Sequence, residues 1–253
     1  MDLGLTDRVF VVTAASSGLG FATAEQLVAE GARVVLVARR EELLAERRAQ
    51  LGEDRAVTLT ADLAEPGVPE QACRLALDTF GRLDGAMISV GGPPGGKSLE
   101  NSDDQWRAAF ESVFLSAIRT IDAVVELGTA DDLAIGLVLS TSVKVWLPGL
   151  TISNGLRPGL ANLVSQYAAE LGPRGVRLFG LMPGSIATER LQWSMEQADD
   201  PDRQRQQTAA RIPLGRIGDP AEFGRVACFL LSPAAGYVSG TTIPVDGGVL
   251  ATP

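Results

Sequence analysis

Residues 9–20 read VFVVTAASSGLG, a stretch that joins a strand pattern to a glycine turn and the start of a helix. The apolar and β-branched run Val9–Thr13 is typical of a buried strand, and the segment Gly20–Glu30 has a helical apolar pattern. A strand, a glycine turn and a helix in this order are typical of dinucleotide-binding sites, because the backbone can approach a pyrophosphate there and the helix N-terminus favours its charge. Ala14 stands where such motifs have their first glycine, so a purely structural turn remains an alternative.

Strand-like and helical patterns alternate along the rest of the chain. We expect strands at Arg33–Ala38, Ala56–Thr60, Gly85–Val90, Ala134–Ser140, Val176–Met182 and Thr242–Val245, and helices at Arg40–Leu51, Glu70–Phe80, within Asp103–Leu127 and at Leu156–Leu171. Near-continuous apolar strands separated by helices predict a parallel sheet that is covered on both faces. No linker or repeat interrupts the alternation. The sequence therefore predicts a single α/β domain over residues 1–253, with a doubly wound (Rossmann), mainly parallel, seven-stranded sheet.

Two segments lie outside this alternation. Residues 91–96, GGPPGG, form a turn-rich loop directly after an expected strand. Residues 189–211 are polar and helical in pattern, and we interpret them as a helical lid over a substrate, because loops at the carboxyl ends of parallel strands bind ligands. Trp193 and Met195 would either contact the substrate or anchor the lid, and Leu147, Gly149 and Leu150 are candidates for the other side of the pocket.

Composition excludes several classes of function. The chain has a formal net charge of −9 and no cluster of lysine and arginine, which argues against a nucleic-acid partner and against binding to anionic membrane surfaces. No stretch approaches the roughly 20 apolar residues of a membrane span. The N-terminus lacks the pattern of a secretion signal, so we expect a cytoplasmic protein in which Cys73 and Cys228 are buried free thiols.

Some residue types are absent or rare. The chain has no histidine, which excludes histidine triads and histidine-ligated metals, and we expect no metal site. Its two lysines are Lys97 and Lys144, and its two tyrosines are Tyr167 and Tyr237. A mechanism that needs an amine or a phenol therefore has few candidates, and we expect both tyrosines to serve in core or interface packing.

The end of the second strand bears on the choice of cofactor. Sites that prefer NAD place an acidic residue there for the ribose 2′-hydroxyl, whereas this chain has Ala38 followed by Arg39 and Arg40. A guanidinium pairs well with a 2′-phosphate, so we favour NADP(H) over NAD(H). Alternatively, the two arginines simply begin a solvated helix. Asp62, after the third strand, would either face the adenine or cap a helix.

These motifs, in this order, resemble the short-chain dehydrogenase/reductase family over nearly the whole chain. TAASSGLG is similar to the family's Thr-Gly-x-x-x-Gly-x-Gly, and PGSIAT at 183–188, IPLGRIG at 212–218 and YVSGTTIPVDGG at 237–248 are similar to its later segments. Where the family has Asn-Asn-Ala before a glycine, this chain has Ile88, Ser89 and Val90. With the arginines above, the resemblance implies a cofactor site formed by Thr13, Ser16, Ser17, Gly18, Leu19, Gly20, Asp62, Leu63, Val90, Gly91, Gly92, Arg157, Pro183, Gly184, Ile186 and Thr188.

The catalytic positions depart from the family. The resemblance implies Asn, Ser, Tyr and Lys, but Val113 replaces the Asn, Ser153 the Tyr and Arg157 the Lys, while Ser140 takes the Ser position. The pattern Ser-Asn-x-x-Arg resembles a divergent branch of the family described as 3-oxoacyl-carrier-protein-reductase-like. Ser140 and Ser153 could donate hydrogen bonds to a developing oxyanion. Arginine does not readily release its proton, so Lys144 is the candidate acid, or else a solvated loop cation.

Three hypotheses follow. The first is an NADPH-dependent reductase of a ketone or other carbonyl, in a small metabolite or an acyl chain, with a non-standard proton donor. The second is a non-redox enzyme, such as a cyclase, dehydratase or isomerase, and the third is an inactive cofactor-binding subunit. The helices expected within Asp103–Leu127 and at Leu156–Leu171 resemble those that build the family's dimer interface, which implies a homodimer or homotetramer.

Overall fold

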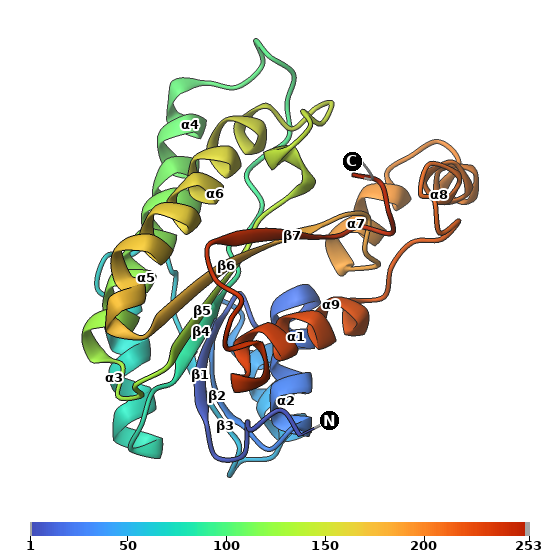
Figure 1. Cartoon of the computed structure of the whole chain (residues 1–253). Coiled ribbons are helices and arrows are strands. Elements are labelled where there is room, and N and C mark those ends of the chain that lie inside the picture. Colours follow the sequence, from blue (N-terminus) through green and yellow to red (C-terminus); the bar gives the residue numbers. More distant parts are fainter. Residues whose placement is uncertain (1, 251–253) are drawn as a thin grey trace.

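The computed structural model describes residues 2–250 and contains one seven-stranded sheet (Figure 1). The strands lie in the order β3-β2-β1-β4-β5-β6-β7, and every neighbouring pair is parallel. Their bounds are β1 Val9–Thr13, β2 Arg33–Ala38, β3 Ala56–Thr60, β4 Gly85–Ile88, β5 Leu133–Val138, β6 Val176–Pro183 and β7 Thr241–Val245. The predicted doubly wound α/β fold is confirmed, with β4 and β5 each ending two residues earlier than expected.

Helices cover both faces of this sheet (Figure 1). One face carries α1 (Gly18–Ala29), α2 (Glu41–Leu51) and α9 (Pro220–Leu231), and the other carries α3 (Val68–Phe80), α4 (Asp103–Ala109), α5 (Ser116–Leu127) and α6 (Thr151–Leu171). The order of the strands reverses direction between β1 and β4. Ligands of doubly wound sheets bind at that point, beyond the carboxyl ends of the strands.

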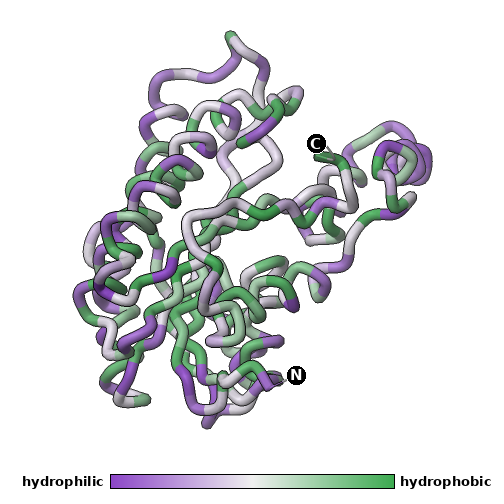
Figure 2. Tube along the Cα trace, in the orientation of Figure 1, coloured by the Kyte–Doolittle hydropathy of each residue, from purple (hydrophilic) through white to green (hydrophobic). Residues whose placement is uncertain are grey.

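The two-sided burial follows from the residues of β1. Val9 and Val11 belong to the core cluster that includes α3, α5 and α6 residues, whereas Phe10 and Val12 belong to the cluster that includes α1 and α9 residues. Alternate side chains of a strand point to opposite faces, so a strand that is apolar at every position needs a layer on each side. Figure 2 shows the same arrangement, with hydrophobic residues concentrated along the central strands.

Three elements differ from the sequence prediction. The expected long helix is interrupted by a π-helical segment, Phe110–Leu115, between α4 and α5. Helix α6 begins at Thr151, five residues before the predicted start, so that Ser153 lies in its first turn. The predicted elements omit α9, which a capping box at Asp219 and Glu222 identifies.

The segment predicted as a lid, residues 189–211, forms two helices. Helix α7 spans Glu189–Glu196 and α8 spans Pro201–Ala210, and α8 begins at an Asp200 cap followed by proline. Both helices project beyond the carboxyl end of the sheet (Figure 1). Met195 is buried, whereas Trp193 is exposed. Whether each residue contacts a substrate or anchors the segment stays a prediction.

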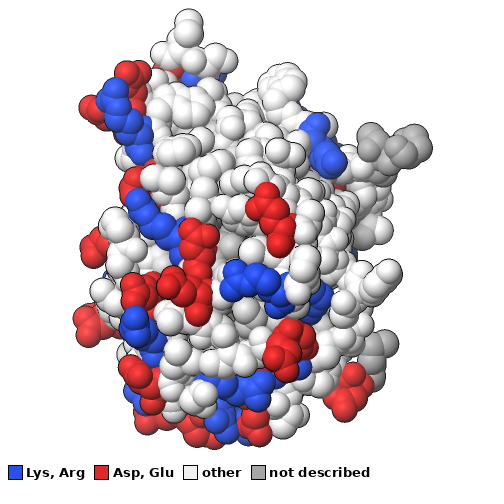
Figure 3. Space-filling model, turned by 60° about the vertical axis from the view of Figure 1, so that its left-hand side comes forward, with Lys and Arg blue, Asp and Glu red and all other residues white. Residues whose placement is uncertain are grey.

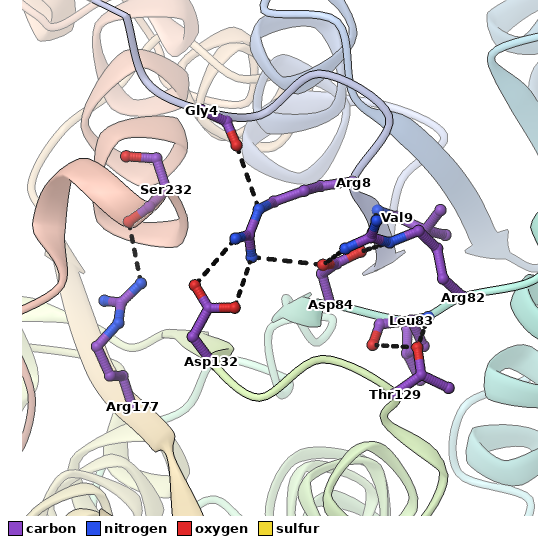
Figure 4. A network of polar contacts seen from close by, with 10 residues as sticks. All are labelled: Gly4, Arg8, Val9, Arg82, Leu83, Asp84, Thr129, Asp132, Arg177 and Ser232. Atoms are coloured by element: carbon purple, nitrogen blue, oxygen red, sulfur yellow. Dashed lines mark hydrogen bonds and ion pairs between the residues drawn. The ribbon is translucent and has the colours of Figure 1, made fainter.

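An ionic network lies at the amino end of the central strands (Figure 4). The carboxylate of Asp84 is completely buried and accepts from the backbone N–H of Val9 at 2.8 Å and from the guanidinium groups of Arg8 and Arg82. Arg8 also pairs with Asp132 at 3.0 Å. A buried charge is stable only when it is paired and hydrogen-bonded, and this network meets that condition. It ties β1 to the chain before β4 and before β5.

The surface over α4, α5 and α6 carries both signs of charge. Figure 3 shows lysine and arginine interspersed with aspartate and glutamate on this face. No helix within residues 2–250 combines the length and the apolarity needed to cross a membrane. Cys73 and Cys228 are buried and unbonded, as predicted, and burial raises the pKa of each thiol to about 12.

Candidate active site

The loop after β1 has the backbone of a phosphate-binding turn. Ala14 adopts the left-handed region with φ of 49°, and Gly18 does so with φ of 59°. A Cβ atom on Gly20 would lie 2.7 Å from the carbonyl oxygen of Ala14, so only glycine lets α1 approach the strand end this closely. The Thr13 hydroxyl accepts from the N–H of Ser89 at 2.9 Å. Thr13 therefore ties this loop to the segment after β4.

Arg40 lies over this loop. Its guanidinium donates to the Ser16 hydroxyl at 3.0 Å, to the Ser17 hydroxyl at 2.6 Å and to Glu189 at 3.1 Å. Arg39 points elsewhere: it is 76% exposed and reaches Asp62 at 3.5 Å. Of the two arginines named from the sequence, Arg40 is thus the one positioned beside the glycine loop.

Other predicted cofactor residues lie in the segments after β3 and β4. Asp62 accepts from the N–H of Ala64 at 3.0 Å, which makes it a turn-capping residue in this structure. Leu63 and Val90 are half-buried against the core cluster, and Gly91 and Gly92 are exposed after β4.

The turn after β6 leads to Thr188, which meets the glycine loop. Gly184 follows Pro183 and donates to the carbonyl of Val245 at 3.0 Å, and Ile186 is buried. Thr188 caps α7 through its hydroxyl, and its methyl group lies 3.4 Å from where a Cβ on Gly18 would be. Residues distant in sequence, Gly18 and Thr188, therefore meet at the glycine loop.

Three serine hydroxyls gather after β5. Ser140 is half-buried and its hydroxyl accepts from the N–H of Ser142 at 3.1 Å. Ser142 and Ser153 are both buried, and their oxygens lie 3.4 Å apart. The sequence analysis named Ser140 and Ser153 but missed Ser142. Its position two residues after Ser140 is the signal that could have found it. The chain makes a short helical turn there, at Thr141–Val143, and so keeps Ser142 close to Ser140.

Asn154, the residue after Ser153, holds the preceding loop in place. Its side-chain amide donates to the carbonyl of Leu147 at 2.9 Å and accepts from the N–H of the same residue at 3.0 Å. This pair of bonds fixes the loop after β5 to the first turn of α6. In the Ser-Asn-x-x-Arg pattern, Asn154 therefore positions the loop, while Ser153, one residue earlier, is left facing Ser142.

Arg157 lies one helical turn beyond Ser153. It is 5% exposed, and Nη1 donates to the carbonyl oxygen of Val138 at the end of β5. Its Nε is buried and has no hydrogen-bond partner among residues 2–250. Burial, and after it the positive charge of Arg190, lowers the pKa of Arg157 to about 10. Arg190, on α7, was not a candidate in the sequence analysis.

The remaining residues considered from the sequence differ in burial. Lys144 is exposed after the short helix Thr141–Val143, the location expected of a solvated loop cation. Val113, at the family's Asn position, is completely buried within the π-helical segment. Tyr167 is half-buried against the core, and burial raises its pKa, but Tyr237 is fully exposed. The prediction of core packing is therefore wrong for Tyr237, while packing in an interface between subunits stays a prediction.

The fold is that of a Rossmann-type α/β protein with a glycine-rich loop at the strand-order reversal. The chain belongs to the short-chain dehydrogenase/reductase family, and the family model described as Enoyl-(Acyl carrier protein) reductase matches residues 13–250. It is 30% identical to levodione reductase of Leifsonia aquatica, over 96% of this chain and 94% of that protein. It is 29% identical to the 3-oxoacyl-[acyl-carrier-protein] reductase FabG of Vibrio cholerae, over 98% and 99%.

Solved structures agree over the full length. The structure of L-sorbose reductase from Gluconobacter frateurii, complexed with NADPH and L-sorbose, superposes with a TM-score of 0.92 at 27% identity and covers 100% of both chains. A short-chain dehydrogenase/reductase from Brucella melitensis superposes with a TM-score of 0.90 at 28% identity, covering 98% and 99%. The predicted family and fold are confirmed.

Proposed function

We propose that this protein is an NADPH-dependent reductase of a carbonyl group in a small molecule or an acyl chain, with a non-standard proton donor. The observation that carries the proposal is the group formed by Arg40, Ser16 and Ser17 on the glycine loop, at the end of the sheet where such cofactors bind. The levodione and L-sorbose reductases it resembles support the reaction class.

The residues present fit a nicotinamide dinucleotide. Gly20 lets α1 pack against the carbonyl oxygens of Thr13 and Ala14, and the N–H groups at the N-terminus of α1 would favour the pyrophosphate anion. Arg40 and the Ser16 and Ser17 hydroxyls would hold a 2′-phosphate, and Thr188 would contact the cofactor from the side of α7. When bound, NADPH supplies the hydride that adds to the carbonyl carbon.

The chain's own residues act on the carbonyl oxygen. Ser142 and Ser153, with Ser140 beside them, donate hydrogen bonds to this oxygen as it gains negative charge. Arg157 adds a nearby positive charge but keeps its proton, since arginine is a poor acid. The alkoxide oxygen then takes its proton from solvent that reaches the serine hydroxyls. General acid catalysis typically contributes about 10² to 10⁴-fold, so a reactive carbonyl tolerates this arrangement.

The segment 189–211 is proposed as the substrate lid. Its exposed Trp193 and the exposed Trp146 of the loop after β5 would supply apolar contacts to a ligand. We also propose a cytoplasmic homodimer or homotetramer that associates through α5 and α6, as the family resemblance implies.

Calorimetric titration with NADPH and with NADH tests the cofactor part. We expect the wild type to bind NADPH more tightly, and Arg40→Gln to weaken NADPH binding by about 10- to 100-fold, since a charge-assisted hydrogen bond contributes about 1.5–3 kcal/mol. NADH affinity should change little. Arg205→Gln, on the exposed surface of α8, is the control.

Reduction of a carbonyl panel that includes levodione and L-sorbose tests the reaction. Carbonyl-dependent oxidation of NADPH is the expected result. NADPH binding with no carbonyl reduced would contradict a reductase and leave a non-redox enzyme or an inactive subunit. Turnover without a change in the NADPH:NADP⁺ ratio identifies the former, and a stable complex with an active homologue identifies the latter.

A further inference from the structure

A second guanidinium group, that of Arg47, reaches the glycine loop from helix α2. Its Nε donates to the carbonyl oxygen of Ser16 at 3.2 Å, and its Nη1 donates to the side chain of Gln50 at 2.8 Å. The guanidinium carbon lies 4.5 Å from the centre of the Phe21 ring, which belongs to the first turn of α1. Arg47 is half-buried, so α2, the glycine loop and α1 together hold its side chain in place.

Arg40 and Arg47 meet at the same residue, Ser16. Arg40 donates to the Ser16 hydroxyl from Nε at 3.2 Å and from Nη2 at 3.0 Å, while Arg47 donates to the backbone carbonyl of that residue. Ser16 is itself buried. Three hydrogen bonds therefore join the two arginines through one residue of the glycine loop, and they fix both its side chain and its backbone.

These bonds determine what the Ser16 hydroxyl can do. A hydroxyl has one hydrogen to donate and two lone pairs that accept. The two N–H groups of Arg40 use the accepting side, and the hydroxyl hydrogen has no acceptor among residues 2–250. Ser16 can therefore donate to an anion that lies beside Arg40. Arg47 holds the backbone of Ser16, and so keeps this donor in place.

The two arginines that directly follow β2 each lie beside a carboxylate. Arg39 is 3.5 Å from Asp62, and Arg40 is 3.1 Å from Glu189. Each of these pairs has no net charge. A phosphate monoester carries roughly −1.5 to −2 charges at pH 7, so a 2′-phosphate at this place needs positive charge beyond the pair of Arg40 and Glu189.

Arg47 can supply that charge, since it forms no ion pair with a carboxylate in the described part of the chain. Glu25, on α1, is close enough to interact with its charge, but Glu25 is exposed and does not pair with it. An arginine without a carboxylate partner is not unusual here, since Arg177 bonds to backbone carbonyls alone among residues 2–250. What distinguishes Arg47 is its bond to Ser16.

We propose that Arg47 is a positioning residue for the 2′-phosphate of NADP(H), and that it acts through Ser16 to set a preference for NADP(H) over NAD(H). This inference rests on the proposed function and adds a specificity-determining residue to its cofactor site. Arg47 contributes in two ways: it fixes the hydroxyl donor beside Arg40, and it adds a positive charge at the same loop residue.

Two anionic groups of the cofactor have to be distinguished, because a pyrophosphate also binds at a glycine loop. The pyrophosphate is common to NADPH and NADH, whereas only NADPH has the 2′-phosphate. A residue that shapes the loop alone would therefore affect both cofactors alike. The geometry favours the 2′-phosphate, because Ser16 is bonded to Arg40 at the end of β2, the place where folds of this type recognise the ribose.

Calorimetry on the whole chain compares NADPH with NADH and, without the nicotinamide, adenosine 2′,5′-bisphosphate with adenosine 5′-monophosphate. Arg47→Gln should weaken binding of the two 2′-phosphorylated ligands by about 5- to 20-fold and change the other two by less than about two-fold. Arg47→Lys keeps the charge and should recover part of the loss. In Arg47→Gln the affinity for NADPH should also depend less on salt, because one cation near the phosphate is gone.

Arg48→Gln is the matched control. Arg48 follows Arg47 on the same helix, is also half-buried and also donates Nε to a backbone carbonyl at 3.2 Å, but this carbonyl belongs to Ala56 at the start of β3. It also lies 3.5 Å from Glu53. Its loss removes an arginine away from the glycine loop, so the preference for NADPH should stay. Circular dichroism checks folding, and an unchanged affinity for NADH shows that the loop is intact.

The remaining outcomes separate this inference from the proposed function. If Arg47→Gln weakens NADPH and NADH equally or weakens neither, or if Arg48→Gln has the same effect, the inference falls and the proposed cofactor stands. If the wild type binds both cofactors equally, the proposed NADPH preference falls together with the inference. If Arg47 sets the preference and no carbonyl is reduced, the inference stands and the reductase falls.

Discussion

The side-chain oxygens of Ser142 and Ser153 lie 3.4 Å apart, although eleven residues separate them in the sequence. Both are buried, and Ser153 stands where the family resemblance implies a tyrosine. A tyrosine offers one hydroxyl at the end of a long side chain. Here, two short side chains bring their hydroxyls together instead, one from the loop after β5 and one from helix α6.

Replacing Ser153 or Ser142 by alanine should lower kcat by about 10²-fold, since each hydroxyl stabilises the developing oxyanion. The double variant should lose less than the product of the two single effects, because contacting residues are not additive. Steady-state kinetics with a substrate from the carbonyl panel measure this. Ser165→Ala, on the exposed side of the same helix, should leave kcat unchanged, and unchanged kcat in Ser153→Ala would rule out the proposed role.

The Glu189 carboxylate lies 3.1 Å from the guanidinium of Arg40, the group proposed to hold a 2′-phosphate. Glu189→Gln should therefore tighten NADPH binding by about three- to ten-fold and leave NADH binding unchanged, since a competing negative charge is removed. The gain should shrink as salt is added, because both groups are more than half exposed. Calorimetry at low and high ionic strength measures both effects, and equal gains for NADPH and NADH would contradict the assignment.

The pH profile should report on Arg157. Burial and the charge of Arg190 lower its pKa to about 10, so the guanidinium is charged below that pH and loses its charge above it. The affinity for NADP⁺ should fall as pH rises through about 10, because Arg157 is among the predicted cofactor residues and then loses its positive charge. Arg190→Gln should move this midpoint upward, since loss of a neighbouring positive charge favours the protonated form. Binding is measured from pH 8 to 11 with circular dichroism as the check on folding, and an unmoved midpoint would contradict the coupling.

The lowered pKa of Arg157 also affects the stability of the folded protein. Its folded pKa lies below that of the unfolded chain, so burying the charged form opposes folding at neutral pH. This opposition fades as pH rises through about 10. A fall in binding at that pH therefore does not come from Arg157 destabilising the fold.

Ala14→Gly should stabilise the protein. Ala14 has φ of 49°, a region that costs a non-glycine residue about 1–2 kcal/mol, while glycine loses more backbone entropy on folding. The net gain should be about 0.5–1 kcal/mol in the free energy of unfolding. Urea denaturation of this variant and of Ala15→Gly measures it. Ala15 is buried and has no positive φ, so glycine there should destabilise, and equal effects at both sites would contradict the argument.

Asp84→Ala should be strongly destabilising, by about 3–5 kcal/mol, because it leaves the guanidinium groups of Arg8 and Arg82 without their buried partner. Asp132→Ala is the comparison. It removes the other carboxylate that Arg8 contacts, but Asp132 is 49% exposed, so the loss should stay below about 1 kcal/mol. Urea denaturation with equal losses for the two variants would show that burial does not set the difference.

Much of the fold was predictable because its signals are local. The apolar runs at Val9–Thr13 and Arg33–Ala38 are buried on both faces, and a parallel sheet is the arrangement that buries them. Element boundaries were less predictable. Helix α6 begins at Thr151 because two interactions hold its first turn. Gly96 forms a β-bridge with Leu150, and the side chain of Asn154 bonds to the backbone of Leu147. Both depend on how the preceding loop folds back, and a helical sequence pattern does not show this.

The cofactor side of the site was also within reach of the sequence. A glycine loop after a strand is a local sequence pattern, and Arg40 directly follows the next strand. Both features could therefore be predicted from the sequence. That Arg40 rather than Arg39 turns toward the loop depends on Ser16, Ser17 and Glu189, which the fold brings to Arg40 from two other segments of the chain.

The sequence by itself therefore determined the sheet, the family and the glycine loop, since apolar periodicity and glycine spacing act over a few residues. Only the tertiary structure decided which side chains of the candidate site meet. Ser142 meets Ser153 because the loop after β5 lies against the first turn of α6. Hydrogen bonds and charge repulsion act through space, so their partners become known only when the chain has brought them together.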